Sequence, residues 1–264
     1  MLHYRVLEGE KPLIILHGLY GSGDNWFAMA KQFAPEYKVY LPDLRNHGNS
    51  FHNAVHNYEV MAKDVYQIIE KEKLSDIVLL GHSMGGKAAM QLSLMYPDLF
   101  EKLIVVDISP FSYVKASSEM KQQAIFHNTI IDTFLNVDVS GNKGRIEIED
   151  AMAEKIPSAN VRMFLLKNLK RAKDKSFYWQ HNTQALKDNI DDILYASIKA
   201  LKEFDKPVLF IKGENSPYIK DAEEPELKKL FKKATLTTIF DAGHWVHAEQ
   251  PEMFLKVVKD YLLE

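Results

Sequence analysis

Hydrophobic positions along the chain fall into short aliphatic runs separated by longer stretches with helical spacing. The short runs are rich in β-branched residues, so they predict buried strands at residues 13–16, 39–41, 77–80, 103–106, 208–211 and 236–240. Residues 58–72 carry apolar side chains at helical spacing with charges opposite, and helices are also predicted from about Asn25, over 86–92 and over 251–263. This alternation of strand and helix is typical of an α/β fold with a mostly parallel central sheet and helices on both faces.

The alternation breaks between residues 109 and 204. That segment lacks convincing strands and has helical patterns at 161–172 and 182–200, with a turn predicted at Gly141-Asn142-Lys143-Gly144. We therefore expect one domain, with a core built from residues 1–108 and 205–264 and an inserted helical lid at 109–204. The lid should lie over the carboxyl ends of the strands, where such sheets bind their ligands.

A candidate nucleophile lies in Gly81-His82-Ser83-Met84-Gly85, between a predicted strand and a predicted helix. Gly-x-Ser-x-Gly in the context strand, sharp turn, helix is typical of a nucleophilic serine. The turn holds the serine in a strained conformation with its hydroxyl above the sheet edge. Glycines are required two residues to either side because the strand and the helix pass too close for larger side chains. The pattern predicts Ser83 as the nucleophile.

A nucleophilic serine needs a general base from elsewhere in the fold. His244 is the best candidate, because it directly follows the last predicted strand on a glycine-bearing turn at the same sheet edge. His82 is a poor base, since side chains of neighbouring residues diverge at a sharp turn. His17 precedes Gly18 at the end of the first strand, and we expect it to order the loop rather than to react.

Composition narrows the choice of function. The chain has 264 residues, a net charge of −3 with both signs interspersed, and no cysteine. These values give no electrostatic case for nucleic-acid binding and exclude disulfides and a thiol nucleophile. No histidine pair has metal-ligand spacing with a matching carboxylate, so no metal is expected. We see no signal peptide and no membrane span, which favours a cytoplasmic protein. We expect a monomer or a homodimer.

Several motifs together resemble a known family. They are His17-Gly18-Leu19-Tyr20-Gly21-Ser22, residues 43–50 (DLRNHGNS), residues 81–87 (GHSMGGK), Asp107-Ile108-Ser109-Pro110 and Gly243-His244-Trp245. In these the chain resembles the α/β-hydrolase fold, and within it the small bacterial carboxylesterases related to mitochondrial abhydrolase-domain proteins. The resemblance implies cofactor-free, serine-dependent hydrolysis of small acyl esters or thioesters.

Acyl transfer produces an oxyanion that needs preorganised hydrogen-bond donors. The backbone N–H groups of Met84, just after the nucleophile, and of Leu19, just after His17-Gly18, are in the positions that would supply them. Tyr20 and His82 are expected to shape the substrate pocket. The charges of residues 43–50 are interpreted as structural.

The acid of the predicted triad is an open choice between two positions. The fold's commonest arrangement places an aspartate after the penultimate strand, where this chain has Gly213-Glu214-Asn215-Ser216 and a hydroxyl at the expected site. A hydroxyl does not stabilise the imidazolium that forms during catalysis. Asp107 ends the strand after the nucleophile's helix, and the resembling branch uses that position. We favour Asp107 and keep Glu214 as the alternative.

The predicted lid carries a basic cluster and three consecutive aromatic residues. Lys167, Lys170, Arg171, Lys173 and Lys175 are interpreted as a solvated helix face, or else as contacts for an anionic substrate tail such as the phosphates of coenzyme A. The aromatic residues Phe177, Tyr178 and Trp179 are expected to pack in the core rather than to wall the substrate site.

The sequence favours a serine carboxylesterase or thioesterase that works through an acyl-enzyme. Two alternatives remain open from sequence alone. One is different chemistry on the same triad, such as carbon–carbon bond hydrolysis or cofactor-free haloperoxidation. The other is a small-ligand sensor without catalysis, against which an intact set of serine, histidine and carboxylate argues.

Overall fold

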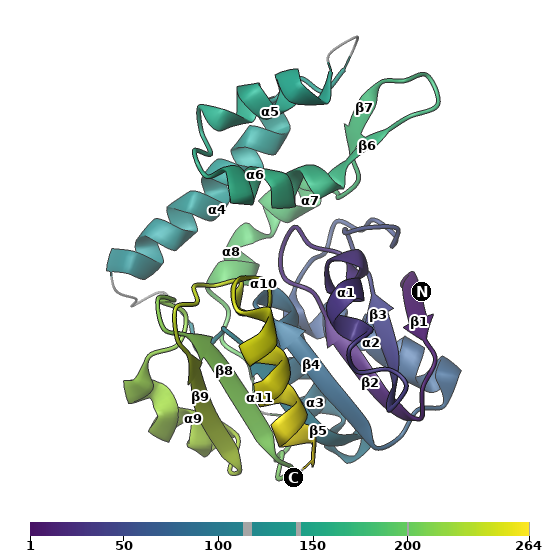
Figure 1. Cartoon of the computed structure of the whole chain (residues 1–264), viewed down its shortest axis with the longest axis vertical. Coiled ribbons are helices and arrows are strands. Elements are labelled where there is room, and N and C mark those ends of the chain that lie inside the picture. Colours follow the sequence, from purple (N-terminus) through teal and green to yellow (C-terminus); the bar gives the residue numbers. More distant parts are fainter. Residues whose placement is uncertain (113–117, 141–143, 200, 264) are drawn as a thin grey trace.

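The computed structural model describes residues 1–112, 118–140, 144–199 and 201–263. A seven-stranded sheet crosses the molecule, with helices on both of its faces (Figure 1). Its strands are β1 (Tyr4–Leu7), β2 (Lys11–Leu16), β3 (Tyr37–Pro42), β4 (Ile77–His82), β5 (Phe100–Val106), β8 (Val208–Gly213) and β9 (Ala234–Ile239). Their order across the sheet is β1-β3-β2-β4-β5-β8-β9, and β1 alone runs antiparallel to its neighbour. The predicted mostly parallel sheet is confirmed.

The helices that cover the sheet follow the strands in sequence. They are α1 (Phe27–Ala30), α2 (Tyr58–Glu72), α3 (Met84–Met95), α9 (Glu224–Leu230), α10 (Val246–Glu249) and α11 (Pro251–Leu263). Short 3₁₀ turns lie at Gly23–Trp26, Pro97–Leu99, Leu166–Asn168 and Asp221–Glu223. The helix predicted from Asn25 is therefore only a 3₁₀ turn and one α-helical turn, whereas the predicted bounds of α2 and α11 match the structure.

Alternate residues of the central strands pack into two separate cores. In β4, Ile77 and Leu79 belong to the core under α2 and α3, while Val78 and Leu80 belong to the core under α1 and α11. All four are at most 1% exposed. Burial on both faces explains why these strands read as continuous aliphatic runs instead of alternating with polar residues.

The first strand was not predicted from the sequence. β1 lies at the sheet edge, where it pairs with β3 from Tyr4 opposite Pro42 to Leu7 opposite Val39. Its two central residues are exposed and its two outer residues are half-buried. A short edge strand of this kind buries little surface, so its sequence lacks the aliphatic run that identified the other strands.

The described residues between β5 and β8, called the insert below, lie above the carboxyl ends of the strands (Figure 1). The insert contains α4 (Ser118–Asn136), α5 (Arg145–Ala153), α6 (Ala159–Leu165), β6 (Leu169–Arg171), β7 (Phe177–Trp179), α7 (Thr183–Asp188) and α8 (Ile190–Leu194). The turn predicted at residues 141–144 falls mostly outside the described residues. The insert is thus largely helical, but it also holds a two-stranded hairpin.

Two helices predicted in the insert are wrong in extent. The pattern at 161–172 continues only to the end of α6, after which the chain forms the β6–β7 hairpin, paired from Leu169 opposite Trp179. In the hairpin loop Lys175 adopts a φ of 73°, and the Asp174 carboxylate accepts from the Ser176 N–H at 3.0 Å. These local bonds favour a turn over a helix. The pattern at 182–200 gives two short helices, the second of which ends at Leu194.

Candidate active site

Ser83 occupies the sharp turn between β4 and α3. Its backbone φ of 54° and ψ of −122° lie in a region that non-glycine residues rarely adopt. The Ser83 N–H donates to the Val106 carbonyl at 3.0 Å, which holds the turn against β5. A Cβ added to Gly81 would lie 2.3 Å from the Gly85 carbonyl oxygen, and one added to Gly85 would lie 2.4 Å from that of Leu16. The close approach predicted for the two glycines is therefore present.

His244 meets Ser83 across the carboxyl edge of the sheet. It lies in the loop between β9 and α10, and its Nε2 is 3.0 Å from Ser83 Oγ. Its backbone carbonyl accepts from His82 Nε2 at 2.9 Å, and the Tyr218 ring stacks on its imidazole with centroids 4.1 Å apart. The imidazole is thus held in the orientation that a general base for Ser83 requires.

Asp107 holds the other nitrogen of His244. It directly follows β5 with a φ of 52°, and its Oδ2 lies 2.7 Å from His244 Nδ1. The carboxylate is fully buried, and it also accepts from the Gly213 N–H at 3.0 Å and from the Ser216 hydroxyl. Because the carboxylate accepts, Nδ1 carries the proton, which leaves Nε2 free to accept from Ser83.

Glu214, the alternative acid, lies elsewhere. Its side chain is exposed, and its Oε2 accepts from the backbone N–H of Asp241 at 3.1 Å. It therefore braces the turn after β9. The structure brings Asp107, rather than Glu214, to His244.

A cavity of about 490 Å³ opens beside Ser83 and His244. Tyr20 and His82 both line it, together with apolar side chains from the insert: Phe126, Ile130, Val161, Phe164 and Leu165. The Tyr20 hydroxyl donates to the His127 carbonyl at 3.1 Å, so the ring is tied to α4. Burial lowers the pKa of His82 well below its ordinary value, so its ring stays neutral. Its contact with His244 is the hydrogen bond to the His244 carbonyl described above.

Leu19 and Met84, the candidate oxyanion donors, both border a second and smaller cavity that also reaches Ser83. The loop that carries Leu19 lies directly on the nucleophile, because a Cβ added to Gly18 would be 3.2 Å from Ser83 Cβ. The structure thus brings the backbone segments of both residues next to the serine.

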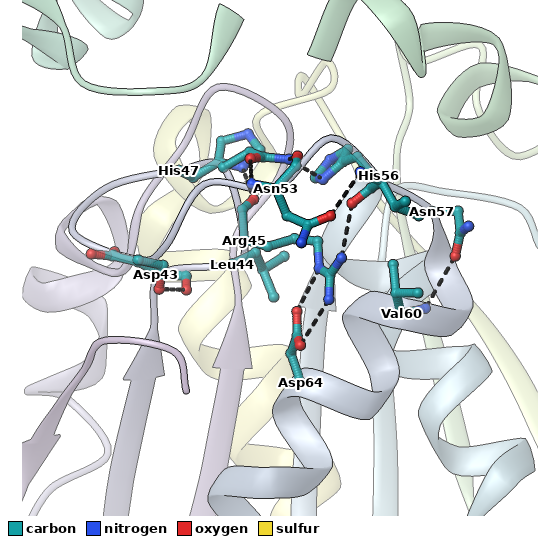
Figure 2. Close-up of polar contacts among 12 residues, drawn as sticks. Asp43, Leu44, Arg45, His47, Asn53, His56, Asn57, Val60 and Asp64 are labelled. Carbon is teal, nitrogen blue, oxygen red and sulfur yellow. Dashed lines mark hydrogen bonds and ion pairs between the residues drawn. The ribbon is translucent and has the colours of Figure 1, made fainter. Parts of the chain in front are cut away.

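His17 and the loop of residues 43–57, which is mostly buried over residues 43–50, support the insert from below. Leu44 N–H donates to His17 Nε2 at 2.9 Å, and His17 Nδ1 donates to the Gly18 carbonyl at 2.8 Å, so His17 orders the loop as expected. Figure 2 shows Arg45 of this loop reaching down to Asp64 on α2, where Nε and Oδ2 are 2.6 Å apart. The charges of this loop are therefore structural.

Two residues near the site were not predicted from the sequence. Lys87 on α3 is fully buried, and its Nζ donates to the Phe111 carbonyl at 3.1 Å and to the Ala196 carbonyl at 2.6 Å. These carbonyls belong to the two ends of the insert, so one ammonium ties both to the nucleophile's helix. Burial lowers the pKa of Lys87 to about 7. The second residue is Tyr218, which stacks on His244. Neither the lysine nor the tyrosine carries a sequence pattern that would predict its contact.

The basic cluster of the insert is not a helix face. Lys170 and Arg171 belong to β6, and Lys173 and Lys175 lie in the hairpin loop, so the predicted helix is wrong although most of the cluster is solvated. Among the aromatic residues, Phe177 and Trp179 pack against the core as expected, whereas Tyr178 is 47% exposed. Lys167 lies outside the hairpin and lines an open groove that shares Phe164 and Trp245 with the cavity at Ser83.

Within the described residues, no group of three or more His, Asp or Glu side chains is arranged to hold a metal ion. Among the described residues, no helix is both long enough and apolar enough to cross a lipid bilayer.

Comparisons with known proteins agree with the fold and the motifs. The profile of the alpha/beta hydrolase fold matches residues 11–251. The chain is 34% identical to "sn-1-specific diacylglycerol lipase ABHD11" of Danio rerio, covering 99% of this chain and 82% of that protein, and 32% identical to "Esterase YbfF" of Escherichia coli, covering 97% and 94%. It is also similar to the solved structure "Marine microorganism esterase", with a TM-score of 0.92, 42% identity and 98% of each chain covered. The chain belongs to the α/β-hydrolase family and is related to its abhydrolase-domain proteins.

Proposed function

We propose that this protein is a serine hydrolase of carboxylic esters, thioesters included, that works through an acyl-enzyme. The observation that carries the proposal is the continuous chain from Ser83 Oγ to His244 Nε2 at 3.0 Å and from His244 Nδ1 to Asp107 Oδ2 at 2.7 Å, at the edge of a cavity. Relatives that carry the names of esterases and lipases support ester hydrolysis as the activity.

In the first half-reaction, Ser83 Oγ attacks the carbonyl carbon while His244 Nε2 takes its proton. The developing oxyanion is held by the backbone N–H groups of Leu19 and Met84. Asp107 stabilises the imidazolium formed on His244. That imidazolium then donates its proton to the leaving oxygen or sulfur, which departs and leaves the acyl group on Ser83.

In the second half-reaction, His244 takes a proton from a water molecule, whose oxygen attacks the acyl-enzyme. Collapse of this second intermediate releases the carboxylic acid and returns the proton to Ser83 Oγ. The insert acts as a lid that walls the cavity with apolar side chains and limits water around the reacting groups.

The experiment is a steady-state assay with p-nitrophenyl acetate and acetyl-coenzyme A, comparing wild type with Ser83→Ala. Hydrolysis should fall by on the order of 10⁶-fold in kcat, as it does when a protease serine is removed. Ser93→Ala is a matched control, because Ser93 is a buried serine on the same helix that donates to the Met90 carbonyl. Equal activity of Ser83→Ala and wild type would overturn the proposal.

A further inference from the structure

Ser83 borders two cavities that differ in size and in lining. The larger one, of about 490 Å³, also includes His244, Trp245 and His247 in its lining. The smaller one has a volume of about 30 Å³ and is lined by Leu19, Met84, Ile108, Met120 and Leu194, among other residues. Of the described residues, His244, Trp245 and His247 line the larger cavity, and the lining of the smaller one includes none of them.

The smaller cavity is mostly apolar, although Gln123 and His127 also contribute to its lining. The hydroxyl of Tyr58, one of its few polar groups, donates to the Ile193 carbonyl at 2.6 Å. The hydroxyl of Tyr218 lies 3.1 Å from His127 Nε2. With these hydroxyls already bonded, Ile108, Met120 and Leu194 supply much of the apolar surface that an acyl chain would contact.

The chemistry of the proposed reaction assigns a role to each cavity. The leaving atom must lie near His244, because His244 protonates it when the tetrahedral intermediate collapses. The leaving group therefore belongs in the larger cavity. The acyl substituent, on the other side of the carbonyl carbon, then points away from His244, toward the smaller cavity, whose lining does not include His244. Building on the proposed serine-esterase function, we propose that the smaller cavity holds the acyl chain and selects short, uncharged acyl groups.

The sizes of the cavities support this assignment. A water molecule needs roughly 10–15 Å³ of such volume, so a cavity of about 30 Å³ takes roughly two or three non-hydrogen atoms. That space accommodates the alkyl part of acyl groups no longer than butyryl. The larger cavity is in the usual range for a small-molecule site. It shares Phe164 and Trp245 with an open groove of about 1050 Å³, so the alcohol part has room to extend to the surface.

Two substrate series separate the two sides of the ester. In the first, p-nitrophenyl esters of acetate, butyrate, hexanoate and octanoate vary the acyl chain alone. In the second, methyl, butyl and naphthyl acetate vary the alcohol alone. We expect kcat/KM to fall at least tenfold from butyrate to octanoate, because an acyl chain that overfills a cavity loses transition-state binding. The acetate series should vary by less than that.

Variants on one helix test the assignment. Met120 and Ala124 of α4 line the smaller cavity, whereas Ile130 of the same helix lines only the larger one among the cavities described. Met120→Ala should raise the hexanoate-to-butyrate ratio of kcat/KM at least fivefold, and Ala124→Val should lower the butyrate-to-acetate ratio. Ile130→Ala, also a buried truncation on α4, should leave both ratios unchanged. Ratios within one variant are insensitive to the fraction of folded enzyme.

The outcomes distinguish this proposal from the function on which it rests. A wild-type preference for octanoate, or a shift in acyl ratio with Ile130→Ala but with neither Met120→Ala nor Ala124→Val, overturns the cavity assignment while leaving a serine esterase. If none of the esters in either series is hydrolysed, the serine-esterase function and the cavity assignment are both overturned.

Discussion

The Ser216 hydroxyl donates a hydrogen bond to Asp107 Oδ2, the same oxygen that lies 2.7 Å from His244 Nδ1. Ser216 follows β8 at the place where the fold's commonest arrangement has its acid, and Asp107 follows the neighbouring strand β5. The two positions are therefore adjacent across the sheet edge. In this chain the carboxylate comes from β5, and the β8 position supplies a donor that orients it.

Replacing Asp107 by Asn should lower kcat by on the order of 10⁴-fold, because the amide neither stabilises the imidazolium nor fixes the required tautomer of His244. Glu214→Gln is the matched control, and since Glu214 braces the Asp241 turn its effect on kcat should be small. Saturating ester kinetics of folded variants measure both. A large loss in Glu214→Gln with activity retained in Asp107→Asn would contradict the geometry.

The adjacency of Ser216 and Asp107 predicts that the acid can be moved between strands. Ser216→Ala should cost only a few-fold in kcat, since one of several donors to the carboxylate is lost. In the Asp107→Asn background, Ser216→Asp should recover at least tenfold in kcat, because a carboxylate then returns to the neighbourhood of His244 Nδ1. No recovery in a folded double variant would show that the two sites are not interchangeable.

The buried ion pair of Arg45 and Asp64 (Figure 2) should be important for stability. Their side chains are 9% and 6% exposed, and Arg45 also donates to the Val55 carbonyl at 2.8 Å. Asp64→Ala leaves a buried guanidinium unpaired, which should lower the free energy of unfolding by about 3–5 kcal/mol. Urea denaturation measures this. The exposed pair Lys63–Glu59 on the same helix is the control, and Glu59→Ala should leave the midpoint unchanged.

Buried neutral histidines should make the protein unstable in mild acid. Burial lowers the pKa of His56 and of His181 to about 3. In the unfolded chain their pKa returns to about 6.5, so below that pH the unfolded state binds more protons than the native state. The free energy of unfolding should therefore fall as pH drops from 7 to 5, by at most about 1.4 kcal/mol per pH unit for each such histidine.

Urea titrations at pH 7, 6 and 5 test this. His181→Gln should flatten the slope of stability against pH relative to wild type. A stability that is constant or rises on acidification over this range would contradict the assignment of neutral buried histidines.

The local parts of the site could be predicted from the sequence. Ser83 and its glycines are adjacent in the chain, so the strained turn and the close approach of β4 and α3 follow from a five-residue pattern. His244 could be predicted as the base because parallel strands place their carboxyl ends at one edge of the sheet, where Ser83 also lies. The choice of Asp107 over Glu214 came from resemblance, since both follow strands at that edge and the sequence does not show which side chain turns inward.

Contacts between distant segments could not be predicted. In the sequence, Lys87 has the pattern of an ordinary helix lysine. Its contacts with the carbonyls of Phe111 and Ala196, at the two ends of the insert, appear only in the folded structure. The β6–β7 hairpin has strands of three residues each, which is too short to show strand periodicity beside the helical pattern of α6. Such features depend on how the insert packs against the rest of the protein, and that packing is determined by residues distributed along the whole chain.

The most direct test of the central claim is labelling with a fluorophosphonate probe followed by peptide mass spectrometry. A serine activated by His244 should form one covalent adduct, on the peptide that carries Ser83, and Ser83→Ala should abolish it. His244→Ala should slow labelling strongly, because the base that activates Ser83 is removed. An adduct on another residue, or labelling that survives in Ser83→Ala, would contradict the assignment of Ser83 as the nucleophile.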